Sequence, residues 1–310
     1  MYINRFCSIS PAGILTQDTP VAALQQPARG KAACIEPDYK ELIAPMQLRR
    51  MTKPVRTGVA AAKLCLGEVL PDAIHVGTAY GMLQDSENFL QKMIVQEEQT
   101  LNPTAFIQST HNTVSGQIAL SLACTAHNMT YVHKAHSFES ALLDAALMLA
   151  ERPEATVLAG AVDECTDTSY AILERFGKYT AADIAGEGAA FFSLSARRTQ
   201  DTLAQLRAFD MFSAADEKTV AASLEQFLQQ HELPVADNDL LLLNAPGSDR
   251  SGGPFRDLET ITYNQYCGAY PTASSFGLAF GIALLKTATT RRCWILSGWG
   301  QHYSVHCLER

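Results

Sequence analysis

The sequence predicts an α/β fold in which strands and helices alternate around a layered sheet. Apolar stretches of strand length, several of them ending near glycine, are followed by longer stretches whose apolar residues recur at helical spacing. With 310 residues, 47% of them hydrophobic, the chain can bury a large core in one big domain or in two fused halves.

The first strand is expected over Tyr2–Ile9 and ends at the turn signal Ser10 to Gly13. Residues 14–45 carry prolines and glycines without a firm period, which predicts an irregular excursion. The helix over 85–98 is expected to start at an Asp or Ser cap, and the helix over 115–126, apolar on most faces, to be buried. The elements expected up to residue 161 are helices over 51–66, 85–98, 115–126 and 137–150 and strands over 73–77, 128–133 and 155–161.

The second part of the chain repeats a similar order of elements. A glycine-rich turn at 186–188 precedes a strand over 189–195, and the polar residues 196–203 are expected to form the seam between two similar halves, 1–195 and 196–310. The elements expected after the seam are strands over 205–209, 240–244, 293–297 and 303–308 and helices over 217–231 and 274–287.

Composition excludes several classes of function. The net charge of −8 and the lack of a Lys/Arg cluster beyond two Arg-Arg pairs argue against nucleic acid, although a local basic patch for an acidic carrier protein stays open. No apolar run approaches the roughly 20 residues of a membrane span, and no signal peptide is apparent. The eight cysteines form no CxxC pair and indicate small core residues in a reducing compartment. We therefore expect a soluble, cytoplasmic protein.

The most informative feature is Ala135, in the run from Asn128 to Leu143. This run predicts a strand, a tight elbow and a helix, a geometry that normally aims a nucleophile at an acyl group. An alanine has no lone pair with which to attack. The pattern therefore indicates catalytic architecture without the catalyst.

The elbow and its surroundings resemble the β-ketoacyl synthases of the thiolase-like superfamily. The run from Ala126 to His136 matches the family strand G-x-N-x-S-I-S-x-A-C-A, with Ala135 at the cysteine, and Ala159-Gly-Ala161 follows at the family spacing. Five further segments match family motifs in the family order: 76–81, 112–119, 186–190, 244–248 and 298–301. The resemblance implies a layered α-β-α-β-α fold built from two similar halves.

In active members of that family, a cysteine at a helix N-terminus takes the acyl chain as a thioester, and two histidines assist decarboxylation and condensation. The resemblance places these three groups at Ala135, Pro246 and Ser274. A single alanine could be an engineered knock-out, but proline and serine at the histidine positions make that explanation poor. We therefore expect no catalytic residue and no cofactor.

Other residues offer weaker candidates for a site. His127, His133 and His136 cluster around the elbow, but their spacing is not an established metal-ligand pattern and lacks acidic or cysteine companions, so no metal site is expected. Cys165 follows a core strand and is interpreted as a buried thiol in preference to a relocated nucleophile.

The resemblance also implies a surface and a channel. The family dimerises through the strand before the elbow, so the expected interface residues are Asn128, Met129, Thr130, Tyr131, Val132 and His133. Phe138, at the start of the elbow helix, and Trp299, at the position of the family's gating phenylalanine, are the candidates for lining an acyl channel.

The family includes non-catalytic chain-length factors, and this chain looks most like one of them. We expect a heterodimer with an active β-ketoacyl synthase, working on acyl chains bound to acyl carrier protein in fatty-acid-like, polyene or polyketide biosynthesis. Two alternatives remain open: an acyltransferase or hydrolase with a relocated nucleophile, and a homodimeric acyl-binding protein.

Overall fold

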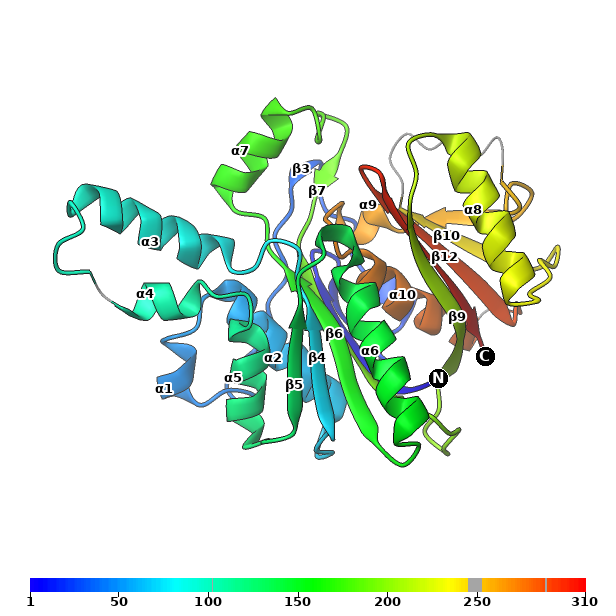
Figure 1. Cartoon of the computed structure of the whole chain (residues 1–310), viewed down its shortest axis with the longest axis horizontal. Coiled ribbons are helices and arrows are strands. Elements are labelled where there is room, and N and C mark those ends of the chain that lie inside the picture. The colour runs from blue at the N-terminus through cyan, green and yellow to red at the C-terminus, as the bar shows by residue number, and fades with distance from the viewer. Residues whose placement is uncertain (102, 245–252, 288) are drawn as a thin grey trace.

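The computed structural model describes residues 1–101, 103–244, 253–287 and 289–310 (Figure 1). Most of its strands join one mixed sheet, in the order β11-β10-β12-β13-β9-β1-β8-β6-β4-β5. Helices of intermediate length cover the faces of this sheet, and no described helix is long and apolar enough to cross a membrane. Pro246 lies outside the described residues.

Two groups of five strands follow the same pattern of pairing. In each group the first strand is antiparallel to the second and the second is antiparallel to the third. The third strand is parallel to the fourth, and the fourth is parallel to the fifth. The first group is β1 (Tyr2–Ser10), β8 (Gly188–Ser195), β6 (Thr156–Asp163), β4 (Ala73–Gly77) and β5 (His127–Tyr131). The second is β9 (Ala204–Ser213), β13 (His302–Glu309), β12 (Arg292–Trp299), β10 (Leu240–Asn244) and β11 (Glu259–Thr262). The seam 196–203 connects β8 to β9, while the division into two separate halves stays a prediction.

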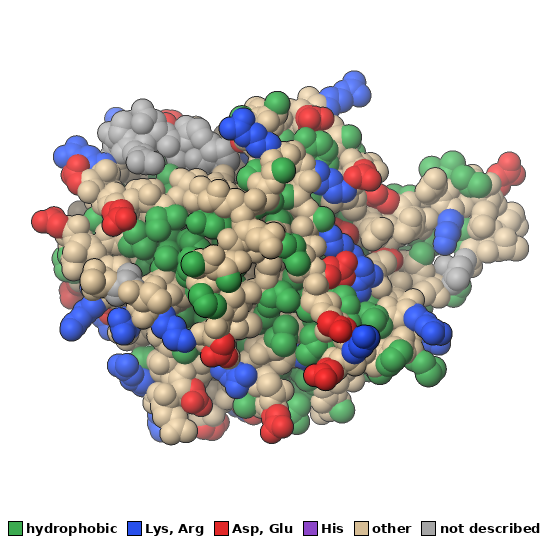
Figure 2. Space-filling model, turned by 180° about the vertical axis from the view of Figure 1, so that it is seen from behind, with side chains coloured by type: hydrophobic (Ala, Val, Ile, Leu, Met, Phe, Trp, Pro, Cys, Tyr) green, Lys and Arg blue, Asp and Glu red, His purple; other side chains and the backbone are tan. Residues whose placement is uncertain are grey.

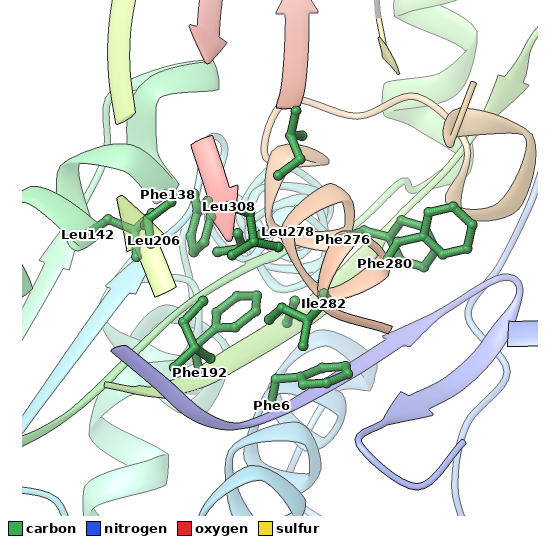
Figure 3. Close-up of a cluster of buried hydrophobic side chains, with 14 of the residues drawn as sticks. Phe6, Phe138, Leu142, Phe192, Leu206, Phe276, Leu278, Phe280, Ile282 and Leu308 are labelled. Atoms are coloured by element: carbon green, nitrogen blue, oxygen red, sulfur yellow. The ribbon is translucent and has the colours of Figure 1, made fainter. Parts of the chain in front are cut away.

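Three apolar cores separate the layers. Helices α2 (Lys53–Leu66) and α5 (Thr113–Leu122) pack on one face of the first strand group. Helices α6 (Ser137–Glu151) and α10 (Ser274–Thr287) share the central core with strands of both groups (Figure 3). Helix α8 (Glu217–Gln230) covers the outer face of the second group. This is the thiolase-like α-β-α-β-α arrangement.

The strands between these layers are buried on both faces, and β10 shows the unbroken apolar sequence that such burial requires. In β10, Leu240 and Leu242 belong to the central core, whereas Leu241 and Leu243 belong to the core under α8. Because successive side chains point to opposite faces of a strand, an unbroken apolar run is what a doubly covered strand requires.

The remaining elements are shorter or project from the body. Helices α3 (Leu83–Val95) and α4 (Pro103–Gln108) extend away from the sheet as a projecting arm (Figure 1). The others are β2 (Gly13–Thr16), β3 (Gly30–Lys31), β7 (Ile184–Ala185), η1 (Val21–Ala23), α1 (Pro45–Leu48), η2 (Lys134–His136), α7 (Asp167–Arg175) and α9 (Asn264–Cys267). Residues 14–45 thus hold only short elements, as expected.

Two expectations about helices were wrong. Helix α3 begins at Leu83 without a side-chain cap, because the buried carboxylate of Asp85 instead accepts a hydrogen bond from the Thr52 hydroxyl at 2.6 Å. Helix α5 ends at Leu122 and buries one face only, with the side chain of Leu120 70% exposed.

The elbow helix lies so close to β4 that one position there must be glycine. A Cβ atom on Gly77 would lie 2.5 Å from both the carbonyl carbon and the oxygen of Ser137, and 2.7 Å from the Phe138 nitrogen. Because these are backbone atoms, the clash with a Cβ atom could be removed only if the start of α6 moved.

We expect Gly77→Ala to lower the free energy of unfolding by about 3 kcal/mol, the upper end for an overpacked site. Urea denaturation of the purified chain measures it. Gly116→Ala in α5 is the matched control, because no atom lies within 4 Å of its added Cβ, and it should gain about 0.5–1 kcal/mol from helix propensity. Equal midpoints for the two variants would contradict the close approach.

Candidate functional site

The elbow places Ala135 at the junction of β5 and α6. Strand β5 ends at Tyr131, the 3₁₀ turn η2 spans Lys134–His136, and α6 begins at Ser137. Lys134 adopts φ +53°, in the left-handed region that a residue with a Cβ rarely occupies. Ala135 itself is 7% exposed, so the position expected to carry the nucleophile presents only a buried methyl group.

The histidines of the elbow hold the turn together. The His133 amide donates to the Ser137 hydroxyl at 2.8 Å, and the His133 ring nitrogen Nδ1 lies 2.9 Å from the Ser140 hydroxyl. His136 Nε2 lies 3.2 Å from the carbonyl oxygen of Tyr303 on β13. Both rings are therefore structural, and His127, His133 and His136 do not converge as one ligand set.

The carboxylate of Asp163, at the end of β6, joins the segment after β4 to the segment before α10. Its Oδ1 accepts from the Thr78 hydroxyl at 3.0 Å and the Ala79 amide at 2.8 Å, and its Oδ2 accepts from the Thr272 hydroxyl at 2.7 Å. Burial raises the pKa of Asp163, and these donors oppose the rise. Thr272 stands two residues before α10, so this bond fixes the start of that helix.

A buried polar cluster lies where α6, α10 and β13 meet. Glu139 Oε1 is 3.4 Å from His306 Nε2, and both side chains are fully buried. Burial raises the pKa of Glu139, and the nearby hydroxyls of Ser274 and Ser304 oppose the rise. Burial lowers the pKa of His306 to about 4. Among the described residues, no contact of hydrogen-bond geometry reaches the Glu139 oxygens or the Ser274 hydroxyl.

This cluster contains Ser274, the residue to which the resemblance assigns the second family histidine. Ser274, the first residue of α10, is 1% exposed and lies beside a carboxyl group rather than beside a nucleophile. Burial favours the uncharged forms of both Glu139 and His306. Sequence reasoning missed both residues, since an acidic residue in a helix and a histidine in a strand give no local signal of pairing.

The two candidate channel residues lie in different surroundings. Phe138 is fully buried in the central core, with its ring centroid 5.6 Å from that of Phe192. Trp299, at the end of β12, packs edge-on against Tyr179 at 5.9 Å, and the Lys178 ammonium lies 4.8 Å from its ring centroid. Their assignment to an acyl channel stays a prediction.

None of the cysteines forms a disulfide, and six of the eight are buried. Cys165, the candidate relocated nucleophile, is 6% exposed, and burial raises its pKa to about 11. A nucleophilic cysteine needs a lowered pKa, because the thiolate is the reactive form. Cys165 is therefore a small core residue, as the sequence indicated.

The fold and the elbow define a ketosynthase-like chain, and comparison with known proteins agrees. Residues 23–239 match the β-ketoacyl synthase N-terminal domain family, so the chain belongs to that family. No curated protein matches the sequence.

Solved structures with the same fold are distant in sequence. A type II PKS acyl-carrier protein in complex with its ketosynthase bound to the hexaketide gives a TM-score of 0.81 at 16% identity, over 99% of this chain and 98% of that chain. The ishigamide ketosynthase/chain length factor gives 0.80 at 16% identity, over 99% and 98%. A ketosynthase in complex with its chain length factor from Xenorhabdus doucetiae gives 0.74 at 11% identity, over 99% and 97%.

The buried histidine of the cluster should make stability depend on pH. Between pH 6.5 and about 4 the unfolded state protonates His306 while the folded state does not, so the free energy of unfolding falls as the pH drops through this window. A shift of this size corresponds to about 3 kcal/mol over the whole window.

We expect His306→Gln to make the slope of melting temperature against pH less positive in that window than it is for the wild-type chain. Glu139 titrates in the opposite sense and is present in both proteins. His231→Gln, at the exposed end of α8, is the control and should keep the wild-type slope. Parallel curves for wild type and His306→Gln would contradict the assignment.

Proposed function

We propose that this chain is a non-catalytic ketosynthase-like subunit, a chain-length factor, that pairs with an active β-ketoacyl synthase and shapes its acyl channel. The observation that carries the proposal is Ala135 on an intact elbow: the turn, its hydrogen bonds and the helix behind it are all present, and only the reactive group is missing. Condensation requires a thiolate at this position.

The surroundings of Cys165 and Ser274 support the same conclusion. A relocated nucleophile would need an activated group, but Cys165 has a raised pKa and Ser274 is buried beside a carboxyl group. Pro246, at the other histidine position, has no group that can donate a proton or stabilise an enolate. Neither Cys165 nor Ser274 therefore offers the activated group that the acyltransferase and hydrolase alternatives need.

The outer edge of the sheet supports pairing with another subunit. Strand β5 is the last strand in the sheet order and pairs only with β4 within the described chain. Met129 on this strand and Val132 just after it are both 41% exposed. An edge strand with apolar side chains is a template for strand addition by a second chain.

The projecting arm adds further apolar surface. Figure 2 shows hydrophobic side chains on the arm formed by α3 and α4. The large exposed apolar residues on the arm are Leu90, Ile94, Val95, Phe106 and Ile107. Apolar side chains gathered on a projecting segment indicate a surface that a partner covers.

The solved structures with a similar fold indicate what kind of partner to test. Two of those named above are a ketosynthase with its chain length factor, and one is an acyl-carrier protein with its ketosynthase. We therefore propose an active β-ketoacyl synthase as the partner, and acyl carrier protein as the bearer of the growing chain in polyketide, polyene or fatty-acid-like assembly.

The proposal is tested by co-expressing this chain with an active β-ketoacyl synthase from the same genome and analysing the products by size-exclusion chromatography. We expect one heterodimer peak, and Met129→Lys should abolish it because an ammonium cannot be desolvated at the centre of the interface. Ile172→Lys on α7 is the matched control, with a side chain of similar exposure, 48%. Separate species with the wild-type chain would overturn the proposal.

The channel assignment is tested by the products of the paired enzyme. Trp299→Ala should lengthen them, because removing the indole deepens the space available to the acyl chain. Phe138→Ala should act in the same direction but also lower stability by about 3–5 kcal/mol, since it empties a core position. Mass spectrometry of the released products measures the length, and an unchanged distribution for both variants would refute the assignment.

A further inference from the structure

Two histidines and an aspartate converge between the elbow helix and the first strand group. His75 comes from β4, His127 from β5 and Asp144 from α6. Asp144 Oδ2 lies 3.2 Å from His75 Nε2 and 3.8 Å from His127 Nε2, and the three ligand atoms all lie within 4.8 Å of one another. The two imidazole rings meet edge to face, with centroids 5.4 Å apart.

The sheet register explains why these residues meet. Ala73 on β4 is opposite His127 on β5, so His75 and His127 occupy the same face of neighbouring parallel strands. Helix α6 packs over this face and brings Asp144 down onto it.

His75 is the unusual member of this set. Its side chain is completely buried, yet neither ring nitrogen has a hydrogen-bond partner among the described residues. The carboxylate of Asp144 is near Nε2, but the contact lacks hydrogen-bond geometry. A buried polar group without a partner costs about 1–3 kcal/mol, and a ligand on His75 would offset that cost.

We propose that His75, His127 and Asp144 bind a divalent transition metal ion of the zinc class. Two imidazoles and one carboxylate are a ligand set that zinc accepts, with bonds of about 2.0–2.1 Å that put tetrahedral ligand atoms roughly 3.3 Å apart. The separations from Asp144 Oδ2, 3.2 and 3.8 Å, approach that value without a metal. The side chains of His127 and Asp144 are 51% and 29% exposed, which leaves a path for the ion and a fourth position for water.

Tyr131 completes the surroundings of the ion. Its hydroxyl donates to Asp144 Oδ2, the same oxygen that faces the two histidines. Outer hydrogen bonds of this kind orient a ligating carboxylate and tune its affinity. The ion would join β4, β5 and α6 at the open edge of the sheet, and this inference does not depend on the proposed pairing with a synthase.

The site differs from the one that sequence spacing suggests. His127 is common to both, but His133 and His136 make other contacts, to Ser140 and to the Tyr303 carbonyl. The two further ligands come from residues 52 positions before and 17 positions after His127, and only the fold brings them together.

The test is competition for Zn²⁺ between the purified full-length chain and a chromophoric chelator, with Co²⁺ absorption as a second readout of tetrahedral coordination. We expect one equivalent of Zn²⁺ per chain. His127→Gln and Asp144→Asn should each weaken binding at least about tenfold. Both residues are partly exposed, so these variants should stay folded, which circular dichroism checks.

His133→Gln is the matched control, because it removes a neighbouring histidine of the same elbow and should leave the affinity unchanged. Tyr131→Phe should weaken binding by a smaller factor. The absence of stoichiometric Zn²⁺ binding, or equal affinities for wild type, His127→Gln and His133→Gln, would overturn the proposal.

Discussion

The buried carboxylate of Asp163 is the interaction on which the geometry of the site depends. It accepts hydrogen bonds from Thr78 and Ala79 after β4 and from Thr272 before α10. A buried carboxyl is tolerated only with donors around it, so these segments are held in one arrangement. The start of α6 packs against Gly77, which is next to Thr78, and Ser274 is the first residue of α10. Asp163 thus ties the segment after β4 to the segment before α10.

The repeated strand pattern explains why two helices share one core. In each strand group the last two strands are parallel, and the helix that connects the outermost strand to the next must cross the face of the sheet. Helices α6 and α10 are these two connections, and both cross the central face. The space is tight: a Cβ on Gly277 of α10 would lie 2.8 Å from the Tyr263 ring and 2.9 Å from Ile295. Glu139 in the first turn of α6 and Ser274 at the start of α10 are neighbours in the buried cluster.

The sequence predicted the elements better than the contacts between them. The start of α6 at Ser137 and both bounds of α10 agree with the expectation, because small and apolar residues there leave little ambiguity. The exposed face of α5 was not predictable, since an apolar helix face does not say whether a neighbour in the same chain covers it. His75 and Asp144, and likewise Glu139 and His306, are distant in sequence. Periodicity predicts which face of its helix or strand a residue occupies, but it does not predict which other segment packs against that face.

The backbone of the elbow is strained at Lys134 although the elbow carries no nucleophile, and this strained conformation needs a physical explanation. A non-glycine residue in the left-handed region, such as Lys134, costs of order 1–3 kcal/mol and survives only where surrounding contacts enforce it. Here the bonds through Ser137 and Ser140 enforce it. These bonds also fix the end of β5 and hence the direction of the edge strand. The strained turn therefore holds the end of β5 in place, and under the proposed function this is the edge strand on which a partner would pair.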